Sequence, residues 1–274
     1  MLAKQRQSVI LRTVRSEGSA RVSDLTQQLG VSDMTIRRDL EVLARTGLIE
    51  KVHGGAVLPG VPSSHEPGFE AKSVRELPEK DMIAKAAAAL VQPGAAVALS
   101  AGTTTYALAE QLFTVPGLTV VTNSMRVASL FNGAGPGGGP AADGIAAASV
   151  VLTGGVRTPS EALVGPIADL AIRSLHFDLL FLGCHGIDPA AGLTTPNLAE
   201  SETNRAFVRS ARRVIVVADH TKWGIVGLSS FADLDEIDTL VTDDQFPEEA
   251  RALVVDRVGQ LVIAEDDQAG AATP

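Results

Sequence analysis

The stretch that decides the fold runs from Val22 to Val57 and reads VSDLTQQLGVSDMTIRRDLEVLARTGLIEKVHGGAV. Its pattern predicts two short helices joined by a tight turn at Gly30, because glycine readily adopts the positive φ that ends a helix. Ser32 stands where the N-cap of the second helix is expected, and Asp33 adds a negative charge to the first turn of that helix. Together these signals favour a helix-turn-helix.

A small hairpin is predicted to follow the second helix. Residues 48–53 alternate as a strand after Gly47, and the glycine pair at 54–55 turns the chain back. The hairpin would form a wing beside the second helix, with Lys51 and His53 within reach of phosphates. His53 could instead be an ordinary turn histidine. The head of the chain is thus predicted to be a winged helix-turn-helix.

The second helix has two faces on a helical wheel. Ile36, Leu40 and Leu43 fall on the side that would pack against the first helix. The other side presents arginines, which suit bidentate contacts to guanine, and hydroxyls that suit phosphates or base edges. The alternative is a solvated, charged face of a small structural bundle, but the turn, cap and hairpin together favour DNA binding. The predicted DNA-binding residues are Ser32, Thr35, Arg37, Arg38, Arg45, Lys51 and His53.

Charge is unevenly spread along the chain. The formal net charge is −9, yet the residues through Leu58 hold nine Lys/Arg against six Asp/Glu, which makes that part +3 and the remainder −12. This distribution excludes a uniformly basic nucleic-acid coat and indicates that only the head meets DNA. The acidic remainder is expected to have another task.

The composition limits the cellular compartment and the kinds of chemistry that can be expected of this chain. We find no apolar run long enough to span a bilayer, and the polar N-terminal residues lack the apolar core of a signal peptide. Cys184 is the only cysteine, so an intramolecular disulfide is impossible and the cytoplasm is the expected compartment. The five histidines lack metal-ligand spacing, so we expect no metal, no cofactor and no membrane partner.

A length of 274 residues suits two domains. We predict a winged helix-turn-helix domain at 1–58, a linker at 59–78, an α/β domain at 79–267 and a flexible tail at 268–274. Apolar strands alternate with amphipathic helices in the second domain, which is typical of a mainly parallel, doubly wound, Rossmann-like sheet. The run of glycine and proline at 133–140 is interpreted as a flexible surface insertion. The strands are expected at 96–100, 118–122, 149–153, 178–183, 214–219, 239–242 and 261–264, and the helices at 4–15, 81–91, 104–113, 124–131, 165–174, 200–210 and 247–257.

Candidate site residues lie at the ends of the strands, because ligands of open α/β sheets bind outside the carboxyl ends. The first strand ends at Ser100 and leads through Gly102-Thr103-Thr104-Thr105 into a helix, whose N-terminal amides suit phosphate. Read alone, this turn could simply be a capped helix start. The other strand ends add glycines, hydroxyls, carboxylates and Lys222, although Lys222 could also be an ordinary exposed lysine. With aromatic residues at only 4%, a small polyhydroxylated phosphate fits better than a nucleotide.

Motifs in both parts of the chain resemble the DeoR family of bacterial transcriptional regulators. They read VSDMTIRRDLEVLARTGLIEKVHGGAV in the head and AGTTTYALAEQL, VVTNS, LTGGVRTPSEALVGPIADLAI, FDLLFLGCHGIDPAAGLTTPNLAESETNRAF and VVADHTKWG in the body. The resemblance implies a winged-helix head joined to a sensor domain similar to phosphosugar isomerases. Family members typically repress sugar or nucleoside catabolism and are released by a phosphorylated sugar.

The resemblance and the strand ends together predict an effector site in the second domain. Two positions depart from the family pattern: many members have an acidic residue where this chain has Ser100, and Asp or Asn where it has His185. Both lie where sugar hydroxyls are expected, so the identity of the sugar stays open. The predicted effector-binding residues are Ser100, Gly102, Thr103, Thr104, Thr105, Asn123, Gly154, Gly155, His185, Gly186, Asp188, Glu202, Asp219 and Lys222.

The leading interpretation is a repressor of carbohydrate catabolism genes that a phosphorylated sugar or polyol releases from double-stranded operator DNA. Activation or dual regulation is one alternative. Another is an active sugar-phosphate isomerase, with base and carbonyl-polarising groups drawn from Asp188, Asp219, Glu202 and Lys222. A sensor needs such groups only to hydrogen-bond a sugar, so we expect no catalytic residues. Because paired heads multiply affinity, a homodimer or homotetramer is expected.

Overall fold

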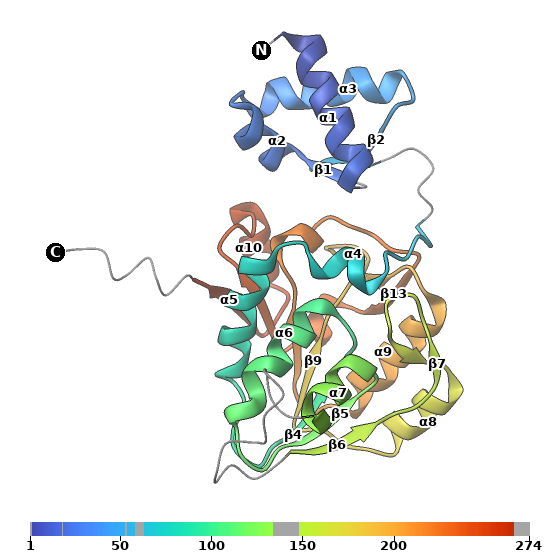
Figure 1. The fold of residues 1–274 in the computed structure, drawn as a ribbon. Helices are drawn as coiled ribbons and strands as arrows, with labels where there is room; N and C mark the ends of the chain where they lie inside the picture. The colour runs from blue at the N-terminus through green and yellow to red at the C-terminus, as the bar shows by residue number, and fades with distance from the viewer. Residues whose placement is uncertain (1, 18, 53, 58–62, 134–147, 266–274) are drawn as a thin grey trace, which may run out of the picture. The chain divides into compact units, whose positions relative to one another are not determined.

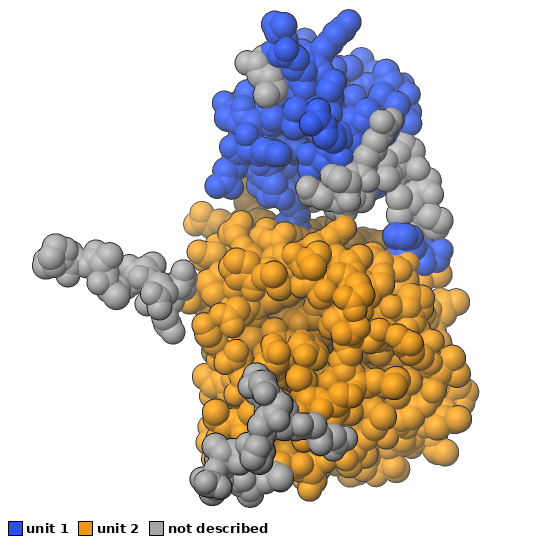
Figure 2. Space-filling view, viewed as in Figure 1, with its two compact units in different colours: residues 1–65 blue, residues 66–274 orange. Residues whose placement is uncertain are grey.

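The computed structural model describes residues 2–17, 19–52, 54–57, 63–133 and 148–265 (Figure 1). These residues fall into two compact units, Met1–His65 and Glu66–Pro274, which Figure 2 colours separately. Unit 1 packs around one hydrophobic cluster and unit 2 around two others. Each unit is therefore described by itself.

Unit 1 is a winged helix-turn-helix domain, as the sequence predicts. Its helices are α1 (Ala3–Glu17), α2 (Val22–Leu29) and α3 (Asp33–Arg45), and its antiparallel sheet has the order β1 (Ser19–Arg21), β3 (Gly55–Val57), β2 (Glu50–Val52). Gly30 follows α2 with a φ of +62°, the left-handed conformation that this turn requires. Ile36, Leu40 and Leu43 are buried in one cluster with Leu25 of α2, as expected.

Two details of α3 go beyond the sequence pattern. Ser32 occupies the N-cap position, but its hydroxyl makes no capping bond and instead lies 2.9 Å from Thr35 Oγ1. Asp39 is buried on the inner face, where it forms an ion pair with Arg6 and accepts a 2.9 Å hydrogen bond from Gln7 Nε2. A buried carboxylate needs such partners, so this contact holds α3 firmly against α1.

The centre of unit 2 is a seven-stranded parallel sheet, which confirms the predicted α/β architecture (Figure 1). Every strand expected from the sequence is present within a few residues of its predicted bounds. The order across the sheet is β15 (Gln260–Ala264), β14 (Thr239–Asp243), β12 (Val214–Val217), β9 (Leu179–Leu182), β4 (Ala96–Leu99), β5 (Thr119–Thr122), β6 (Ser149–Leu152).

Helices cover both faces of this sheet. One apolar cluster joins the sheet to α5 (Leu77–Ala88), α6 (Thr103–Gln111) and α7 (Met125–Gly133). The other joins it to α8 (Pro166–Arg173), α9 (Leu198–Ser210) and α10 (Glu248–Val255). Alternation along β4 shows the division, since Val97 and Leu99 belong to the first cluster and Ala98 to the second. The sheet is thus buried on both sides, as parallel sheets usually are.

Several smaller elements have no counterpart in the sequence-based expectation. They are the hairpin of β7 (Val156–Arg157) and β8 (Leu163–Val164), the antiparallel sheet of β10 (Gly186–Asp188), β11 (Gly192–Thr195) and β13 (Ser229–Ala232), and the 3-10 helices η1 (Leu112–Thr114), η2 (His220–Lys222) and η3 (Leu234–Glu236). Their strands are too short for periodicity to distinguish them from turns. β11 and η2 each contribute a residue to the pocket described below, Thr195 and Lys222.

The predicted linker at 59–78 needs a correction. Residues 66–78 belong to unit 2, where they include helix α4 (Phe69–Ser73) and the start of α5. Within the predicted insertion only Gly133 is described, as the last residue of α7, and the predicted tail at 268–274 lies outside the described residues. Across the described parts of the chain, no helix combines the length and apolarity needed to cross a bilayer.

Candidate functional site

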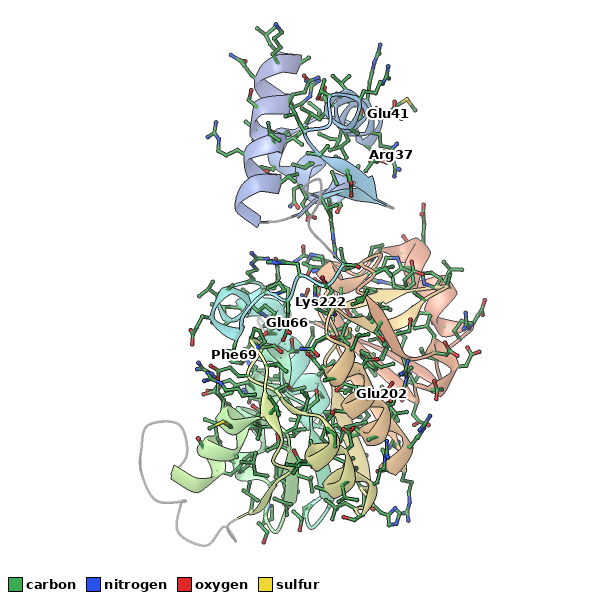
Figure 3. All side chains as sticks on the ribbon, turned by 90° about the vertical axis from the view of Figure 1, so that its right-hand side faces the viewer. Arg37, Glu41, Glu66, Phe69, Glu202 and Lys222 are labelled. Atoms are coloured by element: carbon green, nitrogen blue, oxygen red, sulfur yellow. The ribbon has the colours of Figure 1, made fainter. Side chains whose placement is uncertain are left out.

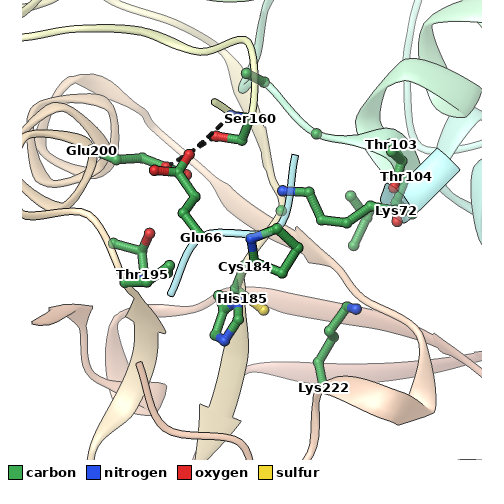
Figure 4. A pocket seen from close by; sticks show the side chains of 16 residues that line it. Glu66, Lys72, Thr103, Thr104, Ser160, Cys184, His185, Thr195, Glu200 and Lys222 are labelled. Carbon is green, nitrogen blue, oxygen red and sulfur yellow. Dashed lines mark hydrogen bonds between the residues drawn. The ribbon is translucent and has the colours of Figure 1, made fainter. Parts of the chain in front are cut away.

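The order of strands in the sheet creates a crevice next to β4. From β4 the chain moves outward on one side through β5 and β6, then returns to the other side of β4 and continues through β9, β12, β14 and β15. The carboxyl ends of β4 and β9 therefore lie at the topological switch point, where open parallel sheets bind their ligands. A pocket opens there, lined by Glu66, Pro67, Lys72, Ala101, Gly102, Thr103, Thr104, Ser160, Gly183, Cys184, His185, Thr195, Pro196, Glu200, Val217 and Lys222 (Figure 4).

One side of the pocket is electropositive. Gly102 is the N-cap of α6, so the first amides of this nine-residue helix and the side chains of Thr103 and Thr104 border the pocket. Lys222 extends into the same space from η2, which follows β12, and Lys72 enters from α4 (Figure 4). Burial lowers the pKa of Lys72, and the nearby charge of Glu200 opposes that shift. Two ammonium groups and a helix N-terminus suit an anion such as phosphate.

The opposite side carries two carboxylates joined through Ser160 (Figure 4). The amide of Ser160 donates to Glu66 Oε1 at 3.0 Å, and its hydroxyl lies 3.4 Å from Glu200 Oε2. Burial alone would raise the pKa of Glu66, but hydrogen bonds from Ser160 and Asn197 and the charge of Lys72 lower it overall. Burial raises the pKa of Glu200 to about 7, against the influence of Lys72. Carboxylates in such a wall accept hydrogen bonds well from the hydroxyls of a polyol.

Five of the predicted effector-binding residues line this pocket, namely Gly102, Thr103, Thr104, His185 and Lys222. Four others are buried close behind the wall: Ser100, Thr105, Asn123 and Asp219. The Asn123 Oδ1 atom accepts a 2.8 Å bond from the Ala101 amide, and Thr105 Oγ1 donates to the Gly102 carbonyl at 3.1 Å. Asp219 lies 3.7 Å from the ammonium of Lys222. These four therefore support the loops that border the pocket and do not line it themselves.

The five remaining predicted effector residues do not line this pocket; they are Gly154, Gly155, Gly186, Asp188 and Glu202. Gly186 serves close packing, since a Cβ there would lie 2.0 Å from the carbonyl oxygen of Ile225. Asp188 caps a turn by accepting bonds from the amides of Ala190 and Ala191. Glu202 is exposed and paired with Arg205, and Figure 3 shows it well away from Glu66 and Lys222.

Sequence reasoning missed five polar lining residues: Glu66, Lys72, Ser160, Thr195 and Glu200. Glu200 belongs to the same acidic helix as Glu202, but residues two apart project from different sides of a helix. The phase of α9 could have distinguished the two. Nothing in the sequence marked Glu66 or Lys72, because the prolines around them indicated a linker.

The second candidate site is the outer face of α3. Arg38 and Arg45 are exposed there, and Arg37 forms an exposed pair with Asp33 at 3.1 Å. Ser32 is exposed and Thr35 is partly exposed at the start of the helix. From the wing, Lys51 reaches Glu41 of α3 at 3.2 Å. His53, which was also predicted to contact DNA, lies outside the described residues. The arrangement presents several cations on one helix, as an element that enters a DNA groove requires.

Neither a metal nor a reactive thiol is indicated by the described residues. No cluster of three or more His, Cys, Asp and Glu side chains among them could hold a metal ion. Burial raises the pKa of the Cys184 thiol to about 12, which keeps it protonated near neutral pH.

Comparisons with known proteins bear on both sites. The DeoR-like helix-turn-helix domain matches residues 6–60, and the DeoR C terminal sensor domain matches residues 75–244. The uncharacterized HTH-type transcriptional regulator YgbI of Escherichia coli is 34% identical over 97% of this chain and 100% of its own length. A putative aga operon transcriptional repressor of Escherichia coli is 35% identical over 89% of this chain and 87% of its own. The HTH-type transcriptional regulator GlpR of Haloferax volcanii is 37% identical over 92% of this chain and 94% of its own.

Among solved structures, a ribose 5-phosphate isomerase A from Methanocaldococcus jannaschii matches 53% of this chain and 53% of its own. The TM-score is 0.35 and the sequence identity is 14%. This likeness is too distant to carry over the chemistry of that enzyme.

Proposed function

This chain belongs to the DeoR family of transcriptional regulators, and on that premise we propose that it is a repressor which a phosphorylated sugar or polyol releases from its operator. A DNA-binding head and a sensor domain are the two parts that such a switch needs. Repression, rather than activation, is proposed because a relative of similar length carries the name of an operon repressor.

In the head, α3 is proposed to enter the major groove with Arg37, Arg38 and Arg45 toward the DNA. Ser32 and Thr35 at the start of the helix would contact phosphates or base edges, and Lys51 and His53 would reach the backbone from the wing. Support comes from the exposure of the α3 cations and from the buried contacts that hold the opposite face of the helix. A helix that is anchored on one side and exposes arginines on the other suits base reading.

In the sensor domain, the observation that carries the proposal is the polarity of the switch-point pocket. A phosphate would lie at the N-terminus of α6 with Lys72 and Lys222, while Glu66 and Glu200 would accept hydrogen bonds from sugar hydroxyls. A ligand with a phosphate at one end and hydroxyls at the other would match the cationic side of the pocket with its phosphate and the acidic side with its hydroxyls. An uncharged sugar would offer no anion to Lys72, Lys222 and the N-terminus of α6.

Thermal unfolding of the full chain tests this assignment. Ribose 5-phosphate, fructose 1-phosphate, glycerol 3-phosphate, their unphosphorylated parents and inorganic phosphate would be compared, since a ligand that binds the native state raises Tm. We expect at least one phosphorylated polyol to raise Tm while its parent does not, and Lys222→Met to reduce that shift. Lys85→Met is the matched control, because Lys85 forms an exposed pair with Asp81 on α5. Equal shifts from a phosphorylated polyol and its parent would refute the assignment.

Several further properties are part of the same proposal. The isomerase alternative draws its acid and base groups from Asp188, Asp219, Glu202 and Lys222. Asp188 and Glu202 do not line the pocket, and Asp219 is buried behind its wall, 3.7 Å from the ammonium of Lys222, so we favour a sensor over an enzyme. We place the protein in the cytoplasm with its DNA. We also propose a homodimer or homotetramer, because one winged helix makes few contacts and paired heads raise both affinity and specificity.

A further inference from the structure

The first residues of unit 2 contribute both to the pocket and to the path of the chain toward the head. Residues 66–76, which we name the strap, begin directly after unit 1 and include α4. Glu66 and Lys72 of the strap line the pocket, one on its acidic side and one among its cations. Chain connectivity therefore makes part of the pocket wall continuous with the segment that leads to the helix-turn-helix.

Arg126 of α7 holds the strap in place. Its guanidinium lies 4.2 Å from the centre of the Phe69 ring, and it pairs with Glu70 on the same strap. Phe69 itself is buried and packs edge-on against Tyr106, with ring centroids 6.0 Å apart. The same guanidinium bonds to Glu161. One side chain thus joins the strap to the turn that carries Ser160.

A second anchor fixes the far end of the strap. The buried side chain of Lys80 on α5 donates to the backbone carbonyl of Lys72 at 2.7 Å and to that of Arg75. At the near end, Glu66 accepts bonds from the Ser160 amide and from Asn197 Nδ2 at 2.9 Å. The strap is thus held at both ends and in the middle, so that a displacement of its α4 turn has to involve these contacts.

The position of Lys72 gives the strap two alternative sets of partners. Lys72 lines the same pocket as Glu66 and Glu200, and the negative charges of these two carboxylates oppose the lowering of its pKa by burial. A phosphate at the N-terminus of α6 would compete for the same ammonium, because Lys72 and Thr103 border one pocket. A ligand shifts a conformational equilibrium only through contacts that differ between two states, and this exchange of partners is such a difference.

We infer that the strap is the transmitting element of the switch: Lys72 binds the anionic ligand directly, and its exchange of carboxylates for ligand displaces the segment that leads to the head. This inference rests on the proposed function. It assigns ligand contact to a residue outside the parallel strands and gives Arg126 a positioning role.

The first test needs no ligand and uses the full chain with a DNA duplex that the wild-type protein selects from a random library. Arg126→Gln removes the cation over Phe69 and both ion pairs, and we expect backbone hydrogen exchange in residues 66–76 to accelerate about tenfold. We expect the Kd for the duplex to change about fivefold or more. Arg257→Gln is the matched control, since Arg257 pairs with Asp235 away from the pocket. Should Arg126→Gln fold poorly, Glu70→Gln removes only the exposed ion pair.

Faster exchange in the strap with an unchanged Kd would overturn the inference, and so would unchanged exchange. A second comparison separates it from the proposed function. If no phosphorylated sugar of the panel alters duplex binding by the wild type, the proposed function fails. If the wild type responds and Lys72→Met responds to the same extent, the role of the strap fails while the proposed function stands.

Discussion

The Ser100 hydroxyl accepts a 3.0 Å hydrogen bond from the amide of Gly183 and so ties together the ends of β4 and β9 at the switch point. Ser100 is 2% exposed and does not line the pocket. The residue that departs from the acidic family pattern is therefore a structural link between two pocket loops. A substitution of Ser100 should therefore affect ligand choice only by moving those two loops.

Replacing Ser100 by alanine should destabilise unit 2 by about 1–3 kcal/mol, because the Gly183 amide loses its partner in a largely buried setting. Chemical denaturation of the full chain measures this loss. Ser174→Ala is the matched control, since Ser174 is exposed at the end of α8. A Ser100→Ala protein as stable as the control would show that the link contributes nothing.

Removing the side chain of Arg38 should weaken binding to the selected duplex by about 1–3 kcal/mol if it reads a base, and should relax preference at one base position. The reason is that Arg38 is exposed on the outer face of α3. Anisotropy titrations of Arg38→Ala and of Arg173→Ala, an exposed arginine on α8, give the comparison. Equal affinity of the two variants would remove Arg38 from the DNA contact.

The ion pair of Arg6 and Asp39 should be the main electrostatic support of the head. Asp39→Ala leaves a buried guanidinium without its carboxylate, so it should destabilise unit 1 by about 3–5 kcal/mol. Hydrogen exchange of α1 and α3 reports this opening. By contrast, Asp33→Ala removes only the exposed pair with Arg37 and should cost less than about 1 kcal/mol. If both variants lost a similar free energy of unfolding, burial would not explain the strength of the Arg6–Asp39 pair.

Glu200 should make stability depend on pH near neutrality. Its pKa is raised from 4.5 to about 7, chiefly by burial, so its contribution is present below pH 4.5 and is lost as the pH rises through 7. Glu200→Gln cannot ionise and should therefore unfold at a higher temperature than the wild type at pH 8, with the difference shrinking toward pH 5. Melting curves of both proteins between pH 5 and pH 8 measure this difference in Tm. A constant difference between the two proteins would argue against titration of Glu200.

Much of the fold could be predicted because the deciding signals are local. Gly30 and the apolar positions of α3 specify the helix-turn-helix, and each core strand is an apolar run bounded by turns. Buried polar contacts such as that of Asp39 could not be predicted in this way. A periodic pattern of apolar residues does not show which polar side chains will pair with each other in the core. The ion pair with Arg6 joins residues far apart in sequence, and only the packing of α1 on α3 brings them together.

Some residues of the pocket could likewise be predicted from the sequence and others could not. Gly102, Thr103, Thr104 and Lys222 were predictable because parallel strands bring their carboxyl ends to one edge of the sheet. Glu66 and Lys72 come from a segment whose composition resembled a linker, and their placement depends on long-range contacts such as that between Glu66 and Ser160. Such contacts leave no local trace in the sequence.

In the proposed switch, a ligand in the switch-point pocket controls DNA binding by α3. The most direct measurement is the Kd of the full chain for the selected duplex, with and without each phosphorylated sugar, in the wild type and in the double variant Thr103→Ala, Thr104→Ala. We expect one phosphorylated sugar to weaken DNA binding by the wild type about tenfold or more, while the double variant binds DNA normally and no longer responds. The same ligand response in the double variant, or none in the wild type, would contradict it.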